Sequence, residues 1–428
     1  MKNPLLSLIT FCLCFFFTDE IVKANTENAF LDINGFVETR IGTRIKNDPQ
    51  QKDMSIGELR AQLETEKDFE EITFTMVTDM VIDPVLDSYT PDLESGKGII
   101  DLRQFNILFS PTDNTDVKLG RQILTWGTGD LLFINDLFAK DFNSFFIGRD
   151  DEYLKAPTDA IKVSIFSDKI NTDLIYVPKF NADRYIDGKR ISYFDPASRR
   201  FKGRDNPIEV DTPDQWFDDD ELTLRLYGTI DNMEAAIYYY HGFWKSPAGM
   251  DTESGKSTFP KLQVLGASLR TPLFKGITSL EAGYYKSDQA AQTDPLSNNS
   301  EFRLLIGHQK EIAKEFTLTI QYQLIHKLNY TDYLTHLPEN AIKQKINHNT
   351  ITLRLTKLML QQNLTLSLFN FYSPSDEDGY LRLQSHYKIT DDLKSTVGLN
   401  YFYGDESHTF YSQFENASNV YTAIRYEY

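Results

Sequence analysis

Two regular patterns predict an all-β fold for this chain of 428 residues. Many stretches of about ten residues carry apolar side chains at alternate positions and polar ones between them, as a strand with one apolar face does. The connections between these stretches alternate between tight turns and long loops. Together these patterns predict a transmembrane antiparallel up-and-down β-barrel of about 18 strands, with 16 as the alternative count.

The alternation is clearest at the end of the chain. Val420, Thr422, Ile424, Tyr426 and Tyr428 share one parity, and the residues between them include Arg425 and Glu427 on the other. Similar windows occur at 31–45, 221–227, 316–324 and 381–389, and a period of 3.6 residues fits none of them. We expect the strands at 31–45, 55–66, 70–81, 100–110, 115–125, 159–168, 171–180, 220–230, 233–244, 261–271, 276–287, 301–311, 315–326, 348–357, 361–372, 379–389, 393–404 and 418–428.

The expected strand at 100–110 has no clear outward face. Phe105, Ile107 and Phe109 lie on one parity, and Leu102 and Leu108 lie on the other. The two sets compete for the same side, so the pattern does not assign this strand's orientation.

The connections favour a membrane barrel over a soluble β-sandwich, which has no reason to alternate its loop lengths. The connection at 373–378 is the one exception on the long-loop rim. An even strand count puts both termini on the short-turn, periplasmic rim. Short connections are expected near 67–70, 111–115, 167–171, 231–232, 271–276 and 390–392, and long ones near 46–54, 82–99, 126–158, 181–219, 245–260, 288–300, 327–347 and 405–417.

The first 24 residues have the layout of a secretory signal peptide. Lys2 precedes an apolar run at 5–17, and Ala24 precedes the expected cleavage site. Both cysteines, Cys12 and Cys14, lie in this segment, so the mature chain would contain no disulfide. Residues 25–428 are expected to form one barrel domain without an N-terminal plug. The formal net charge of −18 argues against nucleic acid as a partner.

The final strand resembles the closing strand of bacterial outer-membrane β-barrels. In that family the terminal aromatic residues, here Tyr426 and Tyr428, form part of the signal read by the barrel assembly machinery. The resemblance implies the outer membrane of a Gram-negative bacterium as the location. There, membrane lipid and lipopolysaccharide would be partners, the latter through divalent cations at acidic loops, and a homo-oligomer stays an open alternative.

A second resemblance concerns Gly120, Arg121 and Gln122, followed by Trp126 and Gly127. This pattern is similar to one in a group of uncharacterised proteobacterial outer-membrane barrels. Some members of that group accompany inner-membrane exporters of lipids or hopanoids, which implies a role in moving hydrophobic molecules.

If the apolar parity faces lipid, the polar parity faces the lumen. That wall carries many charges, which need water or paired neighbours. The structural alternative is that they form ion pairs bracing the wall; the functional one is that surplus arginine creates a field favouring anions. The arginines expected to line the pore are Arg40, Arg44, Arg60, Arg225, Arg270, Arg303, Arg354 and Arg382.

The long loop at 126–158 is expected to fold into the barrel and narrow it. It combines five phenylalanines with clustered acids, and exposed loops seldom carry so many large apolar residues. The alternatives are a cap on the rim or an oligomer contact. A second long loop, 181–219, is a candidate to cover the mouth. The residues expected to form the constriction are Trp126, Asp130, Asp136, Arg149 and Asp150.

No motif in the sequence indicates catalysis or a bound metal. The seven histidines have no metal-ligand spacing, and HExxH, GxSxG and phosphate-binding glycine loops are absent from the sequence. His308 lies on the lipid-facing parity of its strand. The acidic runs 150–152 and 376–378 are interpreted as solvated loops, with Ca²⁺ binding as the alternative. We therefore expect no cofactor, no metal and no enzymatic activity.

The sequence thus predicts a porin-like outer-membrane channel for passive passage of small hydrophilic solutes, with anions preferred. The first alternative is a conduit for lipid or another hydrophobic molecule, working with a periplasmic or inner-membrane partner. The second is a barrel enzyme with a site assembled from distant strands.

Overall fold

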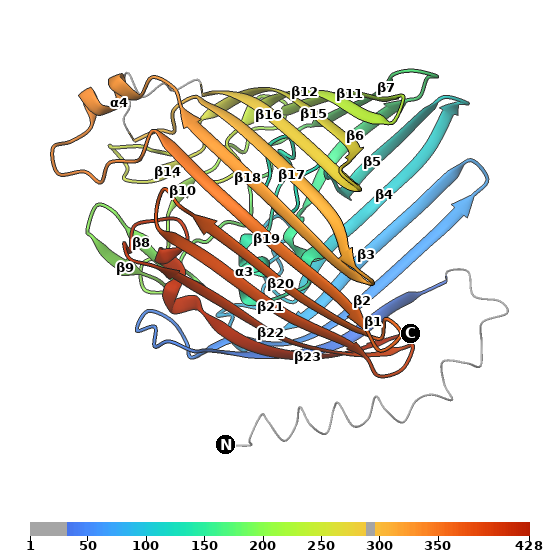
Figure 1. Ribbon diagram of the computed structural model, residues 1–428, viewed down its shortest axis with the longest axis horizontal. Coiled ribbons are helices and arrows are strands. Elements are labelled where there is room, and N and C mark those ends of the chain that lie inside the picture. The colour runs from blue at the N-terminus through green and yellow to red at the C-terminus, as the bar shows by residue number, and fades with distance from the viewer. Residues whose placement is uncertain (1–31, 288–295) are drawn as a thin grey trace.

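The computed structural model describes residues 32–287 and 296–428. The predicted signal peptide, 1–24, lies outside the described residues, as does most of the predicted loop 288–300. Eighteen strands form one sheet (Figure 1): β1 (Asn34–Arg44), β2 (Met54–Phe69), β3 (Ile72–Ile82), β4 (Ile100–Thr112), β5 (Thr115–Ile123), β6 (Pro157–Ile165), β7 (Asn171–Val177), β11 (Glu221–Ile230), β12 (Met233–Phe243), β15 (Lys261–Leu273), β16 (Gly276–Ser287), β17 (Glu301–Ala313), β18 (Phe316–Lys327), β19 (Asn347–Met359), β20 (Leu364–Ser373), β21 (Asp378–Lys388), β22 (Leu393–Gly404) and β23 (Asn419–Glu427).

The sheet closes on itself, which confirms the predicted up-and-down barrel. Each strand pairs antiparallel with its sequence neighbour, and β1 pairs with β23 from Phe36↔Glu427 to Arg44↔Asn419. Closure removes the unpaired strand edges that would cost free energy in lipid. The count is 18, not 16, and every expected strand overlaps an observed one.

The two rims differ as predicted. One rim has short turns such as 69–72, and the other carries the long loops, with the turn after β20 as its short exception. The long loops hold small elements of their own: α3 (Phe142–Ile147), η2 (Asp151–Leu154), β8 (Tyr193–Asp195), β9 (Arg200–Lys202), β10 (Val210–Asp211), β13 (Gly249–Met250), β14 (Ser257–Thr258), α4 (Tyr330–His336) and η3 (Ser412–Ala417).

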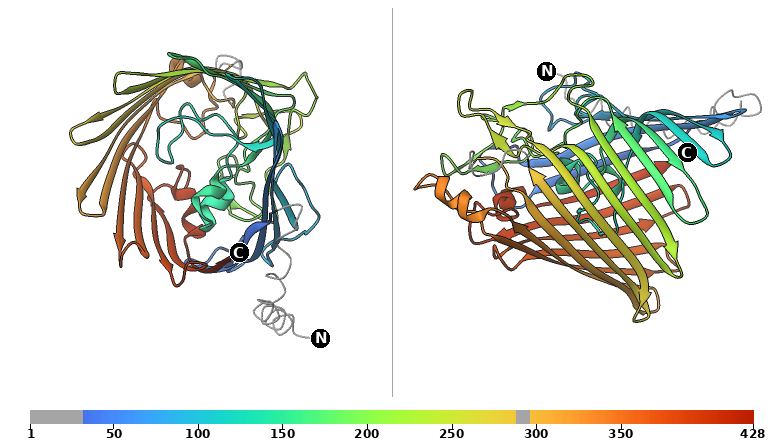
Figure 2. Two further views of the ribbon diagram at one scale, coloured as in Figure 1. Left: turned by 90° about the vertical axis from the view of Figure 1, so that its right-hand side faces the viewer. Right: turned by 90° about the horizontal axis from the view of Figure 1, so that it is seen from above.

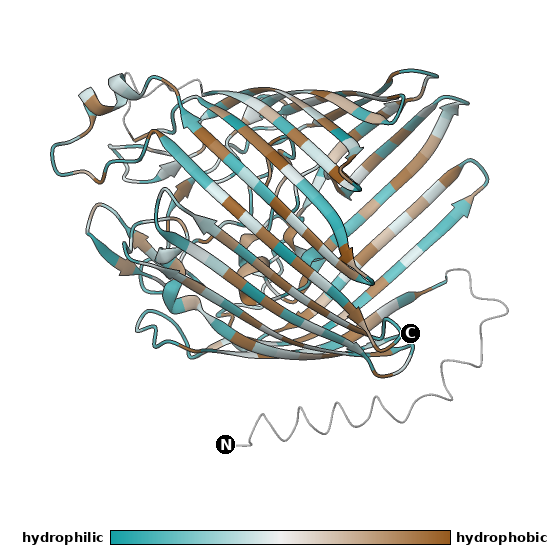
Figure 3. Ribbon diagram, in the orientation of Figure 1, coloured by the Kyte–Doolittle hydropathy of each residue, from teal (hydrophilic) through white to brown (hydrophobic). Residues whose placement is uncertain are grey.

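The outer wall of the barrel is apolar. Ile237 is 57% exposed, Leu265 60% and Val397 60%, all at outward positions of their strands. Apolar bands alternate with polar residues along the strands (Figure 3). An exposed surface of this extent is stable only against lipid, since monomeric soluble proteins rarely expose such patches.

No helix among the described residues has the length and apolar character needed to cross a membrane.

A β-bulge explains the ambiguous alternation of the fourth strand. The register between β3 and β4 shifts where Val77 pairs with Gln104 and Thr78 pairs with Leu102. One extra residue in β4 switches its parity at that point. Phe105 and Ile107 are therefore exposed on the outer wall, while Asp101 and Asn106 are both buried.

The inward parity is not polar throughout, contrary to the simple expectation of a charged lumenal wall. A cluster of inward-facing apolar side chains is buried in the barrel, and the predicted constriction loop packs against it. Side chains of the wall and of the loop fill the interior together, because the wall side chains of an 18-stranded barrel cannot fill it alone. The wall members of this cluster are Ile56, Tyr240, Leu262, Val264, Tyr285, Leu305, Phe369, Phe371, Tyr380, Phe402 and Tyr421.

The outer wall gives a first prediction. Ile237 lies in the middle of β12 and faces outward, so Ile237→Arg is expected to lower the free energy of unfolding in lipid vesicles by about 2–4 kcal/mol. The control is Leu334→Arg, at an exposed position of α4, expected to change it by less than about 0.5 kcal/mol. Equal effects in urea titrations would contradict a lipid-facing Ile237.

Candidate pore constriction

The loop at 126–158 folds into the barrel. Seen along the barrel, the strands form a ring and α3 lies inside it (Figure 2, left). The chain turns inward after β5 at Gly127, whose φ of +87° favours glycine. Trp126, just before the turn, packs on Phe138 and on Tyr238 of β12, with ring centroids 5.0 and 5.9 Å apart.

The first limb of the loop, residues 127–137, is bound by one wall carboxylate. Glu281 of β16 accepts hydrogen bonds from the backbone N–H groups of Thr128, Gly129 and Asn135. The side-chain amide of Asn135 also donates to Glu281, at 3.0 Å. A buried carboxylate needs several such donors, and Glu281 therefore attaches the whole limb to this side of the wall.

The loop then crosses the interior through α3. Asp141 caps this helix by accepting from the N–H of Ser144, and Gly148 ends it with φ +89°. Phe145 and Phe146 project into the aromatic cluster of the wall, where Phe146 lies 5.0 Å from Phe402 between ring centroids. The predicted inward packing of the loop's phenylalanines is thus confirmed for α3.

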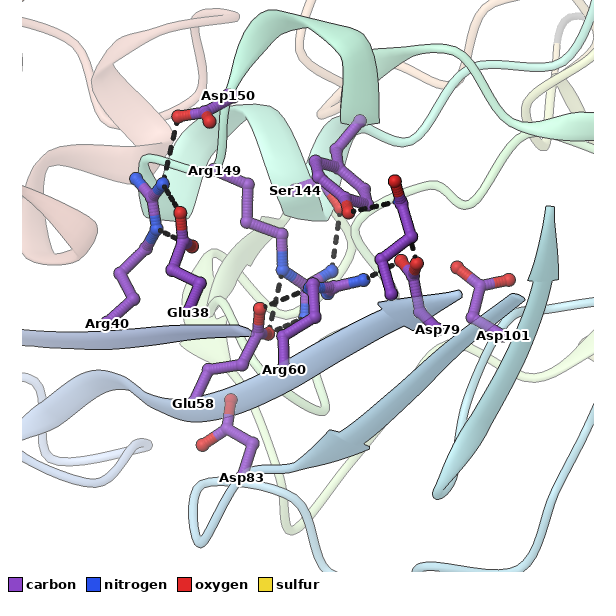
Figure 4. A network of polar contacts seen from close by, with 12 residues as sticks. Glu38, Arg40, Glu58, Arg60, Asp79, Asp83, Asp101, Ser144, Arg149 and Asp150 are labelled. Carbon is purple, nitrogen blue, oxygen red and sulfur yellow. Dashed lines mark hydrogen bonds and ion pairs between the residues drawn. The ribbon is translucent and has the colours of Figure 1, made fainter. Parts of the chain in front are cut away.

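The second limb, residues 148–155, is held by ion pairs to the wall (Figure 4). Asp150 binds Arg40 of β1 at 2.9 Å and Arg425 of β23 at 2.6 Å. Glu38 of β1 bridges the same two arginines, each at 2.9 Å. Arg40 also donates to the carbonyl of Gly148. Two carboxylates and two guanidinium groups thus neutralise one another inside the barrel.

A second network lies beside the first (Figure 4). Arg149 of the loop and Arg60 of β2 both bind Glu58, and Arg60 also binds Asp79 of β3. The ring of Tyr153 packs against the Arg60 guanidinium, 4.3 Å away. In the pairing order of the ring, β2 is diametrically opposite β16. The loop is therefore anchored to both sides of the barrel.

Arg354 of β19 joins the two limbs. Its guanidinium binds Asp130 of the first limb at 2.8 Å and Asp151 of the second at 3.5 Å. Asp151 also binds Arg382 of β21. Among the described residues of the loop, no ion pair joins the two limbs directly, so Arg354 links them through the wall.

The paired charges are exposed unequally. The Asp151 side chain is 38% exposed and that of its partner Arg382 2%; Asp150 is 24% exposed and Arg40 1%. Glu152 is 56% exposed, while Arg425 is 15% exposed. In these pairs the carboxylate is the more exposed partner, whereas Arg354 is as exposed as Asp130 (30% and 28%) and Arg149 is more exposed than Glu58 (14% and 1%).

Three loop carboxyls differ in pKa. Burial raises the pKa of Asp130, and the nearby Arg354 offsets only part of that rise. Burial likewise raises the pKa of Glu152, and Arg425 offsets only part of it. Burial would also raise the pKa of Asp150, but Arg40 and Arg425 lower it below its ordinary value. Asp150 is therefore ionised at neutral pH, in an ion pair that folding stabilises.

The predicted pore-lining arginines all occupy inward positions, yet most are engaged. Arg44 donates to backbone carbonyls, including that of Arg190 at 2.7 Å. Arg225 lies over the ring of Tyr227, and Arg303 binds Glu301 at 2.8 Å. Arg270, near the short-turn rim, is exposed and makes no ion pair among the described residues.

Among the predicted loop residues, Asp136 does not face the lumen. It is buried, and it binds Lys140 at 2.8 Å within the loop itself.

The sequence analysis did not identify Tyr153 or the inward aromatic residues of the wall as members of the site, because no pattern distinguishes them. An inward aromatic in a barrel strand looks the same as one at an interfacial girdle.

The second long loop also enters the mouth. Arg184 binds Asp101 of β4 at 2.8 Å, and Arg190 binds Asp83. Asp183 accepts from the N–H of Lys140, and burial raises its pKa. Part of the 181–219 loop therefore packs on the constriction loop, as expected for a segment that covers the mouth.

Several histidines lie beside threonine hydroxyl groups in the described part of the chain. His348 binds Asp376 at 2.6 Å and lies 3.3 Å from the Thr350 hydroxyl, but Thr350 is buried. His308 faces outward and contacts Thr278. In the described part of the chain, no three His, Cys, Asp or Glu side chains are placed to hold a metal ion.

No protein-family model matches the chain, and no curated protein matches its sequence. Among solved structures, OccAB4 of Acinetobacter baumannii is similar with a TM-score of 0.57 and 10% identity, over 94% of this chain and 100% of that one. OccAB3 of the same organism gives 0.56 and 10%, over the same shares. A mutant porin of Rhodopseudomonas blastica gives a TM-score of 0.40 and 9% identity, over 93% and 100%.

At these identities the two OccAB likenesses show the fold. The sequence pattern that begins at Gly120 and ends at Gly127 has a structural role here. Its Arg121, in β5, binds Asp159 of β6 at 2.7 Å, and the 126–158 loop connects these two strands. The resemblance to an uncharacterised barrel group stays a prediction. The chain has the closed 18-stranded fold of outer-membrane β-barrels.

The network around Glu58 gives a second prediction. Glu58→Gln leaves Arg60 and Arg149 without their shared carboxylate, so we expect the free energy of unfolding to fall by about 3–5 kcal/mol. The control is Glu94→Gln, which removes an exposed pair with Lys179 and is expected to cost less than about 1 kcal/mol. Urea titration in vesicles measures both, and equal costs would contradict a buried network.

The lowered pKa of Asp150 gives a third prediction. The stability that its ionised form contributes is present above the ordinary pKa of 3.8 and is lost as pH falls through the lower folded pKa. The gap in free energy of unfolding between wild type and Asp150→Asn should thus stay constant from pH 7 to about pH 5 and narrow below about pH 4. A gap that widens on acidification would contradict the ion pairs with Arg40 and Arg425.

Proposed function

We propose that the protein is a passive channel of the bacterial outer membrane for small hydrophilic solutes. The observation that carries the proposal is the charged constriction, where loop carboxylates and wall arginines meet at Arg354, Arg382 and Arg425. The exposed part of these charges needs water beside it, because charges in a dry interior cost several kcal/mol each. An apolar outer wall and a closed sheet support the membrane location.

The charge distribution supports a preference for cations over the anions first expected. The anion prediction relied on arginines facing open water, but Arg40 and Arg382 are buried behind Asp150 and Asp151. Arg354 is 30% exposed but paired with Asp130 and Asp151. Arg270 is exposed near the short-turn rim, away from the constriction loop. Exposed carboxylates at a narrow point raise the local concentration of cations. We therefore propose weak cation selectivity, with the acids of the loop as its source.

The conduit for hydrophobic molecules has less support. The aromatic cluster inside the barrel would suit an apolar passenger, but Phe371, Tyr380 and Phe402 are buried against one another and against α3. Every described barrel strand is paired with a neighbour on both sides. Tyr426 and Tyr428, exposed on the outer wall, stay our proposal for the assembly signal.

Single-channel recording in a planar bilayer tests the proposal. Refolded mature protein should give stable ohmic current steps, and a salt gradient should give a reversal potential displaced toward the cation. Folded protein that inserts but passes no current would overturn the channel function and favour the hydrophobic conduit.

The source of selectivity gives a fourth prediction. The double change Asp151→Asn and Glu152→Gln removes two exposed lumenal carboxylates and should reduce the ratio of cation to anion permeability about twofold or more. The control, Glu339→Gln, removes an exposed carboxylate from the rim loop that follows α4 and should leave the ratio unchanged. An unchanged ratio in the double variant would show that these acids do not set the field.

A further inference from the structure

Three long loops and α3 line a partly open cavity of about 690 Å³ at the mouth of the barrel. Its floor includes Phe142 and Phe146 of α3, and its walls come from the 178–220, 244–260 and 405–418 loops. It therefore lies on the long-loop side of the constriction. The volume is in the range of small-molecule binding sites, about 300–1,000 Å³.

The lining of the cavity is rich in rings. Tyr185, Tyr193, Phe194 and Phe410 contribute side chains that are only partly buried, and Phe410 is 47% exposed. The rings of Phe142 and Phe410 come from loops that are far apart in the sequence. Such surfaces bind flat apolar groups, and their faces attract cations.

The charged residues of the lining are mainly acidic. Asp195 is paired with Lys202 at 2.6 Å, so these two neutralise each other. Asp205 and Glu209 are exposed, and their carboxylates have no hydrogen bond or ion pair with any other residue that the structure describes. Two free carboxylates beside aromatic faces complement a positive charge attached to an apolar group.

We propose that this cavity binds small molecules that combine a protonated amine with an aromatic or flat apolar body. The amine is placed near Asp205 and Glu209, and the apolar body lies on the rings between Phe194 and Phe410. The inference deepens the proposed function and rests on it for the role of the site, which is to hold such solutes at the entrance before the acidic constriction.

Binding is tested with three probes of nearly equal shape: phenethylamine, 2-phenylethanol and 3-phenylpropionate. Ligand-observed NMR titration of the refolded full-length barrel in micelles gives the dissociation constants without requiring an open pore. We expect phenethylamine to bind at least fivefold more tightly than 2-phenylethanol, and 3-phenylpropionate to bind most weakly.

Substitutions locate the site. The double change Asp205→Asn and Glu209→Gln should weaken phenethylamine about fivefold and leave 2-phenylethanol unchanged. Phe410→Ala should weaken both probes, because it removes a ring without changing the charge. Glu253→Gln removes an exposed carboxylate that does not line the cavity and should change neither.

Equal binding of the three probes, or equal weakening by Glu253→Gln, would overturn the proposal. A protein that conducts ions but does not discriminate phenethylamine keeps the channel function and loses this site. One that binds phenethylamine through Asp205 and Glu209 but passes no current keeps the site and loses the channel function.

Discussion

Ion pairs between the inward loop and the barrel wall are the interaction on which the interior of this protein depends. A barrel of 18 strands is too wide to be filled by the side chains of its own wall. The 126–158 loop occupies that space only because Glu58, Arg40 and Arg425 on one side and Glu281 on the other hold it in place. Each of those wall charges would be costly without its loop partner, so loop and wall stabilise each other.

The same loop divides the interior into two environments. Toward the wall formed by β20 to β23, α3 completes an aromatic cluster in which Phe146, Tyr380 and Phe402 exclude water. Beside it, Asp151 and Glu152 present carboxylates that are more exposed than the guanidinium groups of Arg382 and Arg425. The loop is thus held by apolar packing on one side and by ion pairs on the other.

The fold was predictable because it follows from a local pattern. In β23, Val420, Ile424 and Tyr426 face outward and Tyr421 and Ala423 are buried, as their parity indicates. The alternation and the two kinds of connection are what a sequence reveals of such a barrel, and strand tilt and register stagger then allow the sheet to close. The pattern misled only where a local irregularity broke the period, as the bulge in β4 did. Burial of the phenylalanines in the 126–158 loop was also predictable, but a cap on the rim and an oligomer contact stayed alternatives to the inward fold.

The sequence by itself thus determined the barrel, its strands, its two rims and the loop that enters it, since period and composition are properties of neighbouring residues. Only the tertiary structure decided which charges pair. Arg354 meets Asp130 and Asp151, and Arg425 meets Glu38 and Asp150, across separations of up to several hundred residues. Electrostatic partners depend on distance in space and on burial, which no spacing along the chain encodes. For that reason the arginines were predictable as inward residues, but the burial of Arg40 and Arg382 behind carboxylates was not.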